Sequence, residues 1–243
     1  MRPIVLFLSC LLLGSPLAAG NIWTQVWADN GDGAANSLPD SSKWRHDTGG
    51  NGWGNSELES YTNRWQNTRY DGAGNLVIEA RAENYTGSDG ITRNYTSGRL
   101  LTAATFNQAY GRFEANIKIP YGQGIWPAFW MLGNNIGSVG WPTCGEIDIM
   151  ENVGYEPNIT HGTIHGPGYS GAGGIGAPFD LGTPVHNSFH QFAVEWEPSI
   201  IRWYVDGVER VARTPADLPG GSTWVYDHPH FLLLNLAVGG AWP

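Results

Sequence analysis

The strongest constraint on the fold is a set of short runs in which apolar and polar residues alternate one by one. Such a period of two predicts a β-strand that buries one face and exposes the other. Three runs of this kind lie at residues 76–81, 112–119 and 192–197. We therefore expect several strands, each packed on one side against an apolar core.

Two further segments extend this pattern. Residues 201–205 and 208–212 flank Asp206-Gly207, and Asp-Gly suits the positive φ angles of a tight type I′ turn, so we expect a hairpin. Residues 230–238 are almost all apolar, which predicts a strand buried on both faces. No window of the sequence has the pattern of an amphipathic helix.

The composition favours many turns between short strands. The chain has 34 glycines and 15 prolines among 243 residues, and only 14% of its residues are charged. Gly-rich segments at residues 30–33, 48–55 and 166–176 are expected to be loops. No repeat, linker or charge block divides the chain. We expect one all-β domain over residues 20–243, a sandwich of two antiparallel sheets.

The first 19 residues have the pattern of a signal peptide. Arg2 supplies the positive start, residues 4–13 are apolar, and Ala18-Ala19-Gly20 offers small residues for cleavage. The apolar run is too short to span a bilayer, and no later segment qualifies. We expect a secreted protein, extracellular or periplasmic, without a membrane span. Cys144 would then be the only cysteine, so no intramolecular disulfide can form.

The net charge limits the partners. A formal net charge of −9 argues against nucleic acid, because phosphates would be repelled. A neutral polysaccharide carries no such penalty, and some of the 12 tryptophans are candidates for stacking on sugar rings. We expect the majority of these indoles to pack in the core.

Three carboxylates lie within six residues in the segment Glu146-Ile147-Asp148-Ile149-Met150-Glu151. In a regular strand Glu146 and Asp148 share a face and Glu151 points to the other. One extra residue, a β-bulge, would bring Glu151 to the same face. The Cα atoms of the two glutamates would then lie roughly 13 Å apart, and their side chains could bring the carboxyls to about 5 Å, the spacing of a retaining glycosidase.

This spacing assigns a role to each carboxylate. Glu146 would be the nucleophile, and Glu151 the general acid and then the base. Asp148 lies between them and is expected to hydrogen-bond Glu146. Two plainer interpretations remain open, a solvated acidic strand face and a calcium site. The apolar residues between the carboxylates indicate one exposed acidic face and a buried back, which does not decide among the three.

The same segment resembles the active-site signature of glycoside hydrolase family 16 in its bulged form. Other motifs resemble the laminarinase-like members of this family and follow in the same order, so the resemblance covers about residues 23–243. These motifs are Asn55-Ser56-Glu57 with Tyr61, Ser97-Gly98-Arg99, Ile119-Pro120, Gly122-Gln123-Gly124, Trp126–Gly133, Gly162–His165, Leu234–Gly240 and Trp242-Pro243.

The resemblance implies a concanavalin A-like β-jelly-roll sandwich of two curved antiparallel sheets, with a substrate cleft on the concave face. It implies a retaining endo-β-1,3-glucanase acting on laminarin-type or mixed-linkage β-glucan. The residues that match catalytic positions are Glu146, Asp148 and Glu151. Those that match substrate-binding positions are Asn55, Glu57, Arg99, Trp126, Trp130 and His165. We assign His161 a structural role.

The resemblance also bears on cofactors and partners. It implies no cofactor or metal ion in catalysis, although some members of the family hold a structural calcium ion away from the cleft. We expect a monomer whose partner is a polysaccharide, not nucleic acid. Family members usually continue beyond the position of Pro243, so we expect the catalytic domain to lack a C-terminal strand. The alternatives are a non-catalytic β-glucan recognition protein and a hydrolase of agarose or carrageenan on the same fold.

Overall fold

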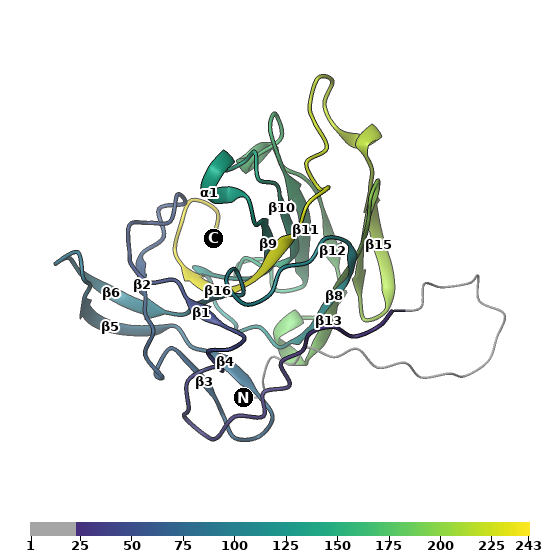
Figure 1. Ribbon diagram of the computed structural model, residues 1–243. Coiled ribbons are helices and arrows are strands. Elements are labelled where there is room, and N and C mark those ends of the chain that lie inside the picture. The colour runs from purple at the N-terminus through teal and green to yellow at the C-terminus, as the bar shows by residue number, and fades with distance from the viewer. Residues whose placement is uncertain (1–22) are drawn as a thin grey trace, which may run out of the picture.

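The computed structural model describes residues 23–243, so the predicted signal peptide lies outside the described residues. Two sheets stacked face to face form the body of the protein (Figure 1). The larger has the strand order β1 (Arg45–His46), β7 (Arg99–Leu101), β16 (His230–Val238), β9 (Ile125–Gly133), β10 (Glu146–Glu151), β11 (Ile159–His165) and β12 (Ile175–Asp180). The smaller has the order β15 (Val208–Arg213), β14 (Ile200–Val205), β13 (His190–Glu197) and β8 (Gly111–Ile117).

Smaller elements flank this sandwich. One three-stranded sheet has the order β2 (Glu59–Tyr61), β6 (Thr92–Ser97) and β5 (Arg81–Thr86), and it projects on the left of Figure 1. A two-stranded sheet pairs β3 (Thr68–Tyr70) with β4 (Leu76–Ile78). The helical segments are α1 (Ile136–Val139) and the 3-10 turns η1 (Gly171–Gly173), η2 (Val185–Asn187) and η3 (Pro215–Asp217).

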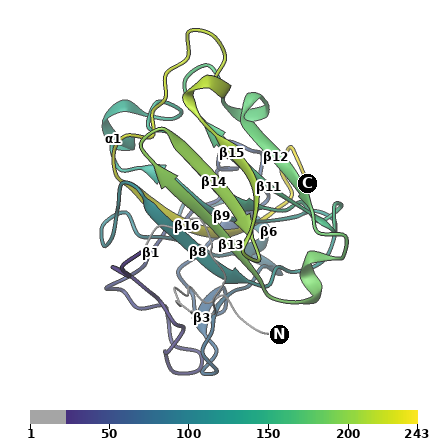
Figure 2. The ribbon, with the colours of Figure 1, turned by 90° about the vertical axis from the view of Figure 1, so that its right-hand side faces the viewer.

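The core lies between the two large sheets. Figure 2 shows the four-stranded sheet lying across the seven-stranded one. Phe129 and Ile147 from the large sheet and Val194 and Trp203 from the small sheet are fully or almost fully buried in one cluster. The predicted all-β sandwich is confirmed. One pairing departs from the antiparallel prediction, because β2 runs parallel to β6. The chain returns to this sheet after the β3–β4 hairpin, which gives the long connection that a parallel pair requires.

The predicted strand at residues 76–81 is wrong in one respect. It is two strands, β4 and β5, which end up in different sheets. Asn67 stands at the break: its carbonyl accepts the N–H of Glu79, and its side-chain amide donates to the Glu79 carbonyl at 3.0 Å. These bonds replace the strand pairing that Glu79 would otherwise make, so the chain can leave one sheet and enter the next.

The other strand predictions are confirmed. The run at 192–197 lies in β13, and the run at 112–119 lies in β8 as far as Ile117. The hairpin forms as β14 and β15, with positive φ angles of 52° at Asp206 and 76° at Gly207. Residues 230–238 form the interior strand β16, which is largely buried. Within residues 23–243, no helix is long and apolar enough to cross a membrane.

Candidate active site

A β-bulge in β10 brings the three carboxylates to one face of the large sheet. Along the neighbouring strand β9, Asp148 pairs with Trp130 but Met150 pairs with Phe129, so β10 contains one extra residue between them. The β9 partners of Glu146, Asp148 and Glu151 are residues 132, 130 and 128, which alternate regularly and therefore share a face. The bulge that the sequence predicts is present.

The apolar residues of the same strand point the other way. Ile147, Ile149 and Met150 all belong to the core cluster between the two sheets. The strand thus has a buried apolar back, and its acidic front faces away from the core. This arrangement explains why three charged residues are tolerated in a strand where every residue after Glu146 is buried.

Glu146 and Asp148 lie close to His165, which pairs with Glu146 across β10 and β11. The Nε2 atom of His165 is 3.1 Å from Asp148 Oδ2 and 3.8 Å from Glu146 Oε1. Burial and then the charge of Asp148 raise the pKa of Glu146, while His165 and an indole N–H oppose this shift. Burial also raises the pKa of Asp148. Two such neighbouring carboxyls hold at least one proton between them at neutral pH.

Within this pair, Glu146 is the more exposed carboxyl. Its side chain is 15% exposed, against 3% for Asp148, so its ionised form keeps more contact with water. Glu146 Oε2 also accepts a hydrogen bond of 2.8 Å from Trp141 Nε1. Trp141 follows α1 and was missed by sequence reasoning, although its position five residues before Glu146 was a usable signal.

Glu151 lies in a different environment. It is 9% exposed, and burial raises its pKa well above the usual range, with further contributions from Asp148 and Glu146. Its Oε1 atom accepts a 3.0 Å hydrogen bond from Trp126 Nε1. Burial thus favours the protonated form of Glu151, which can donate that proton. Both glutamates thus have raised pKa values, and each accepts a hydrogen bond from a different tryptophan.

The face of the large sheet that carries the carboxylates extends towards β7, where tryptophans and an arginine lie on it. Trp130 lies on the same face as the carboxylates, since it pairs with Asp148. The guanidinium of Arg99 lies 4.8 Å from the Trp130 ring centre and 4.7 Å from that of Trp53, and Arg99 Nε donates to Asp47 Oδ2 at 3.0 Å. Trp53 was not predicted at the site. Its loop is 46 residues from Arg99 in sequence, so only the folded chain brings them together.

The predicted residues Asn55 and Glu57 lie in the loop before β2. Asn55 Nδ2 donates to Glu57 Oε1 at 3.1 Å, and the Tyr61 hydroxyl donates to Glu57 Oε2 at 2.9 Å. Asn235 of β16 in turn donates to the Tyr61 oxygen at 3.0 Å. Both oxygens of Glu57 thus have protein partners. Direct contact of Glu57 with a sugar stays a prediction.

Aromatic residues also flank Glu151 on the other side. Trp242 contacts Trp126 edge to face at 5.4 Å between ring centres, and His161 lies 4.9 Å from Trp242. His161 is the β11 partner of Glu151 and makes a 2.8 Å contact with Glu156. It therefore lies beside the carboxylates, although sequence reasoning gave it only a structural role.

The same face could also hold a cation. Within residues 23–243, one group of His, Cys, Asp and Glu side chains is close enough to do so, with ligand atoms within 4.8 Å of one another: Glu146, Asp148 and His165. Burial raises the pKa values of the two carboxyls of this group, Glu146 and Asp148.

The tryptophans divide between this face and the core, and fewer of them are fully buried than the majority expected from the sequence. Those buried in the core are Trp44, Trp196 and Trp203, whereas those beside the carboxylates or Arg99 are Trp53, Trp126, Trp130, Trp141 and Trp242. The lone thiol of Cys144 is buried, and burial raises its pKa to about 11, so it is not a nucleophile.

Comparisons with known proteins agree with this geometry. The family model "Glycosyl hydrolases family 16" matches residues 56–243. A beta-glucanase of Rhodothermus marinus is 43% identical over 97% of this chain and 82% of its own. An endo-beta-1,3-glucanase from Pyrococcus furiosus has a TM-score of 0.85 with 46% identity, covering 91% of this chain and 86% of its own. The laminarinase catalytic domain from Thermotoga maritima gives the same score and identity, covering 92% and 90%.

The family match extends over most of the described chain, and the structural matches extend over nearly all of it. The resemblance found in the sequence is confirmed, including the jelly-roll sandwich that it implies. The chain belongs to glycosyl hydrolases family 16 and is a glycoside hydrolase.

Proposed function

We propose that the protein is a secreted, retaining endo-glycosidase that hydrolyses internal β-1,3-glucosidic bonds of laminarin-type or mixed-linkage β-glucan. The observation that supports this proposal best is the bulge in β10. It turns Glu146, Asp148 and Glu151 to one face, as a nucleophile and a proton donor that act on one sugar linkage require.

In the first step the Glu146 carboxylate attacks the anomeric carbon and forms a glycosyl ester. The bond from that carbon to the glycosidic oxygen breaks, and Glu151 gives its proton to the departing oxygen. Asp148 keeps its own proton and donates a hydrogen bond to Glu146, which prevents repulsion between the two carboxyls.

In the second step Glu151, now ionised, takes a proton from water. The water oxygen binds the anomeric carbon, and Glu146 departs as a carboxylate. Each step inverts the anomeric carbon, so the product keeps the β configuration. Trp126 and Trp141 donate hydrogen bonds to the ionised forms of Glu151 and Glu146 respectively, so they orient both carboxyls.

The choice of a β-1,3-glucan rests on the relatives. The solved structures that are 46% identical to this chain are described as an endo-beta-1,3-glucanase and a laminarinase. The half-exposed indole of Trp141 beside the carboxylates suits the apolar faces of glucose rings. Secretion rests on the signal-peptide pattern of residues 1–19.

Digestion of laminarin, lichenan and agarose, with analysis of products by chromatography and proton NMR, tests the proposal. We expect laminarin oligosaccharides of several lengths early in the reaction, with the β anomer appearing first. An α anomer first would refute retention. Glucan binding without new reducing ends would support a recognition protein, and preferential cleavage of agarose would refute the substrate.

A further inference from the structure

A second pair of acidic residues, Glu57 and Glu59, lies just before and at the start of β2. Glu57 and Glu59 are two residues apart, so their side chains lie on the same side of the chain. Glu59 has no exposed surface at all. Its Oε2 atom accepts a 2.7 Å hydrogen bond from the N–H of Val238, and its buried Oε1 atom has no donor.

An ionised Glu59 would leave that oxygen both charged and unsatisfied. Such a group is strongly unfavourable inside a protein. Burial, followed by hydrogen bonding and charge repulsion from Glu57, raises the pKa of Glu59 to about 8. A proton on Oε1 removes the unsatisfied oxygen, because the resulting hydroxyl donates to the neighbouring carboxylate of Glu57.

We propose that Glu59 is a positioning residue: as a neutral carboxylic acid it donates a hydrogen bond to Glu57, and it thereby fixes the sugar-binding side of the cleft. The inference rests on the proposed function, because the side chains that Glu59 holds in place are those expected to contact the glucan. Glu59 itself is too deeply buried to touch a sugar.

A chain of hydrogen bonds connects Trp130 of the candidate active site to Glu57, and each residue in it donates to the next one towards Glu57. Trp130 Nε1 donates to Asn235 Oδ1 at 2.8 Å, and Asn235 Nδ2 donates to the Tyr61 oxygen at 3.0 Å. The Tyr61 hydroxyl then donates to Glu57 at 2.9 Å. Glu57 is the final acceptor of this chain, so a displacement of its carboxylate would release every donor back to Trp130.

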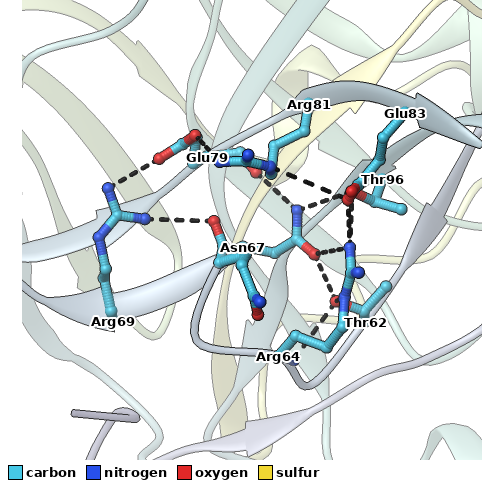
Figure 3. A network of polar contacts seen from close by, with 9 residues as sticks. Thr62, Arg64, Asn67, Arg69, Glu79, Arg81, Glu83 and Thr96 are labelled. Carbon is cyan, nitrogen blue, oxygen red and sulfur yellow. Dashed lines mark hydrogen bonds and ion pairs between the residues drawn. The ribbon is translucent and has the colours of Figure 1, made fainter. Parts of the chain in front are cut away.

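The opposite end of β2 is held by a separate polar network (Figure 3). Thr62 donates to Asn67 Oδ1, and Asn67 Nδ2 donates to Thr96 of β6 at 3.0 Å. Arg64 joins these residues to Glu83 of β5. The backbone of Glu57 is bonded to Gly52 and bridged to Gly239, so what its side-chain partners Asn55, Tyr61 and Glu59 determine is the position of the carboxylate.

Two variants of Glu59 separate the neutral-donor role from a charge or a space-filling role. Glu59→Gln keeps the shape, accepts from Val238 and donates an amide N–H to Glu57. Glu59→Leu has no donor or acceptor. We expect the Gln variant to have the laminarin kinetics of the parent. The Leu variant should raise KM about tenfold with little change in kcat, since one hydrogen bond to a buried charge is lost.

Glu114 provides the matched control. It is a buried glutamate of β8 and is paired with Arg112. It belongs to the four-stranded sheet and lies outside the candidate active site. Glu114→Leu should lower the melting temperature without raising KM. If Glu59→Gln is impaired as severely as Glu59→Leu, or if Glu59→Leu has the parental KM, the proposal is wrong.

Infrared spectroscopy gives a readout that does not depend on activity. The difference spectrum between the parent and Glu59→Gln at neutral pH should contain the C=O stretch of one protonated carboxylic acid. A carboxylate band in its place would overturn the proposal, even if Glu59→Leu fails to fold. If the parent does not cleave laminarin, the proposed function fails, but this spectrum still decides whether Glu59 carries the proton.

Discussion

Trp126 Nε1 donates a 3.0 Å hydrogen bond to Glu151 Oε1. Among the contributions to the pKa of Glu151, this bond lowers the value, while burial and the nearby carboxylates raise it. The acid that we propose thus retains one donor that stabilises its ionised form, which is the form that would act as a base in the second step.

The first prediction concerns this bond. Trp126→Phe removes the donor, so the pKa of Glu151 rises further and its ionised form is less stable. The alkaline limb of the kcat/KM profile should therefore move to higher pH. Deglycosylation at neutral pH should slow at the same time, because a smaller fraction of Glu151 is in the ionised form that acts as the base. Measurement of kcat/KM on laminarin from acid to alkaline pH checks the shift, and an unchanged limb would contradict it.

Trp141→Phe should act on the other limb. The Trp141 N–H lowers the pKa of Glu146, so its loss raises that pKa and the nucleophile ionises only at higher pH. We expect the acid limb of the same profile to move upward. The melting temperature should change little, because the Trp141 side chain is 48% exposed. A shift of the alkaline limb alone would show that the two assignments are exchanged.

Glu146→Gln should abolish turnover while leaving the fold intact, since the amide has almost the same shape. Without a nucleophile no glycosyl ester can form, so an aryl β-glucoside with a good leaving group should not restore activity. Circular dichroism and the melting curve serve as controls for folding. Substantial turnover of such a substrate by this variant would argue that another residue attacks the sugar.

Glu151→Gln should behave differently. Loss of the general acid should reduce the hydrolysis of laminarin by about a hundred- to ten-thousandfold. An activated leaving group needs no proton, so the first step should recover with such a substrate. A burst of released phenol followed by slow turnover would indicate accumulation of the glycosyl ester. Equal losses on both kinds of substrate would contradict the acid–base role.

The stability of the protein should fall as the pH rises above the ordinary glutamate range. The folded-state pKa of Glu59 is about 8, against an ordinary value of 4.5, so the folded chain keeps a proton that the unfolded chain has released. This contribution is fully present below about pH 4.5 and is lost progressively as the pH rises to about 8. Urea unfolding at several pH values should therefore show a weaker pH dependence in Glu59→Gln.

Some of this site could be predicted from the sequence, for a physical reason in each case. Glu146 and Asp148 share a face of a regular strand, whereas Glu151 would point to the other. The three can share a face only if the strand contains a bulge, and the bulge is present. Asp206-Gly207 determined a turn by backbone sterics alone, and its φ angles are both positive. Such signals are local, so they do not depend on which strands become neighbours.

The rest depends on the order of the strands. Arg99 meets Trp130 because β16 lies between β7 and β9. Asn235 on β16 meets Tyr61 because the chain just before β2 bridges to the end of β16. The spacing of these residues in the sequence does not predict that they are in contact. The break at Asn67 was likewise hidden, since the alternation of residues 76–81 is regular and only a distant side chain interrupts it.

The bulge in β10 also bears on how this strand tolerates changes of length. Ile149 is the residue without a partner on β9, so its deletion would restore a regular alternation in which the glutamate after Met150 still shares the face of Glu146. Loss of Ile147 would instead shift the alternation by one residue, so Glu146 would no longer share a face with Asp148 and Glu151. The deletion of a single residue is therefore compatible with the chemistry at one position of the strand, and evolution could shorten it there in a single step.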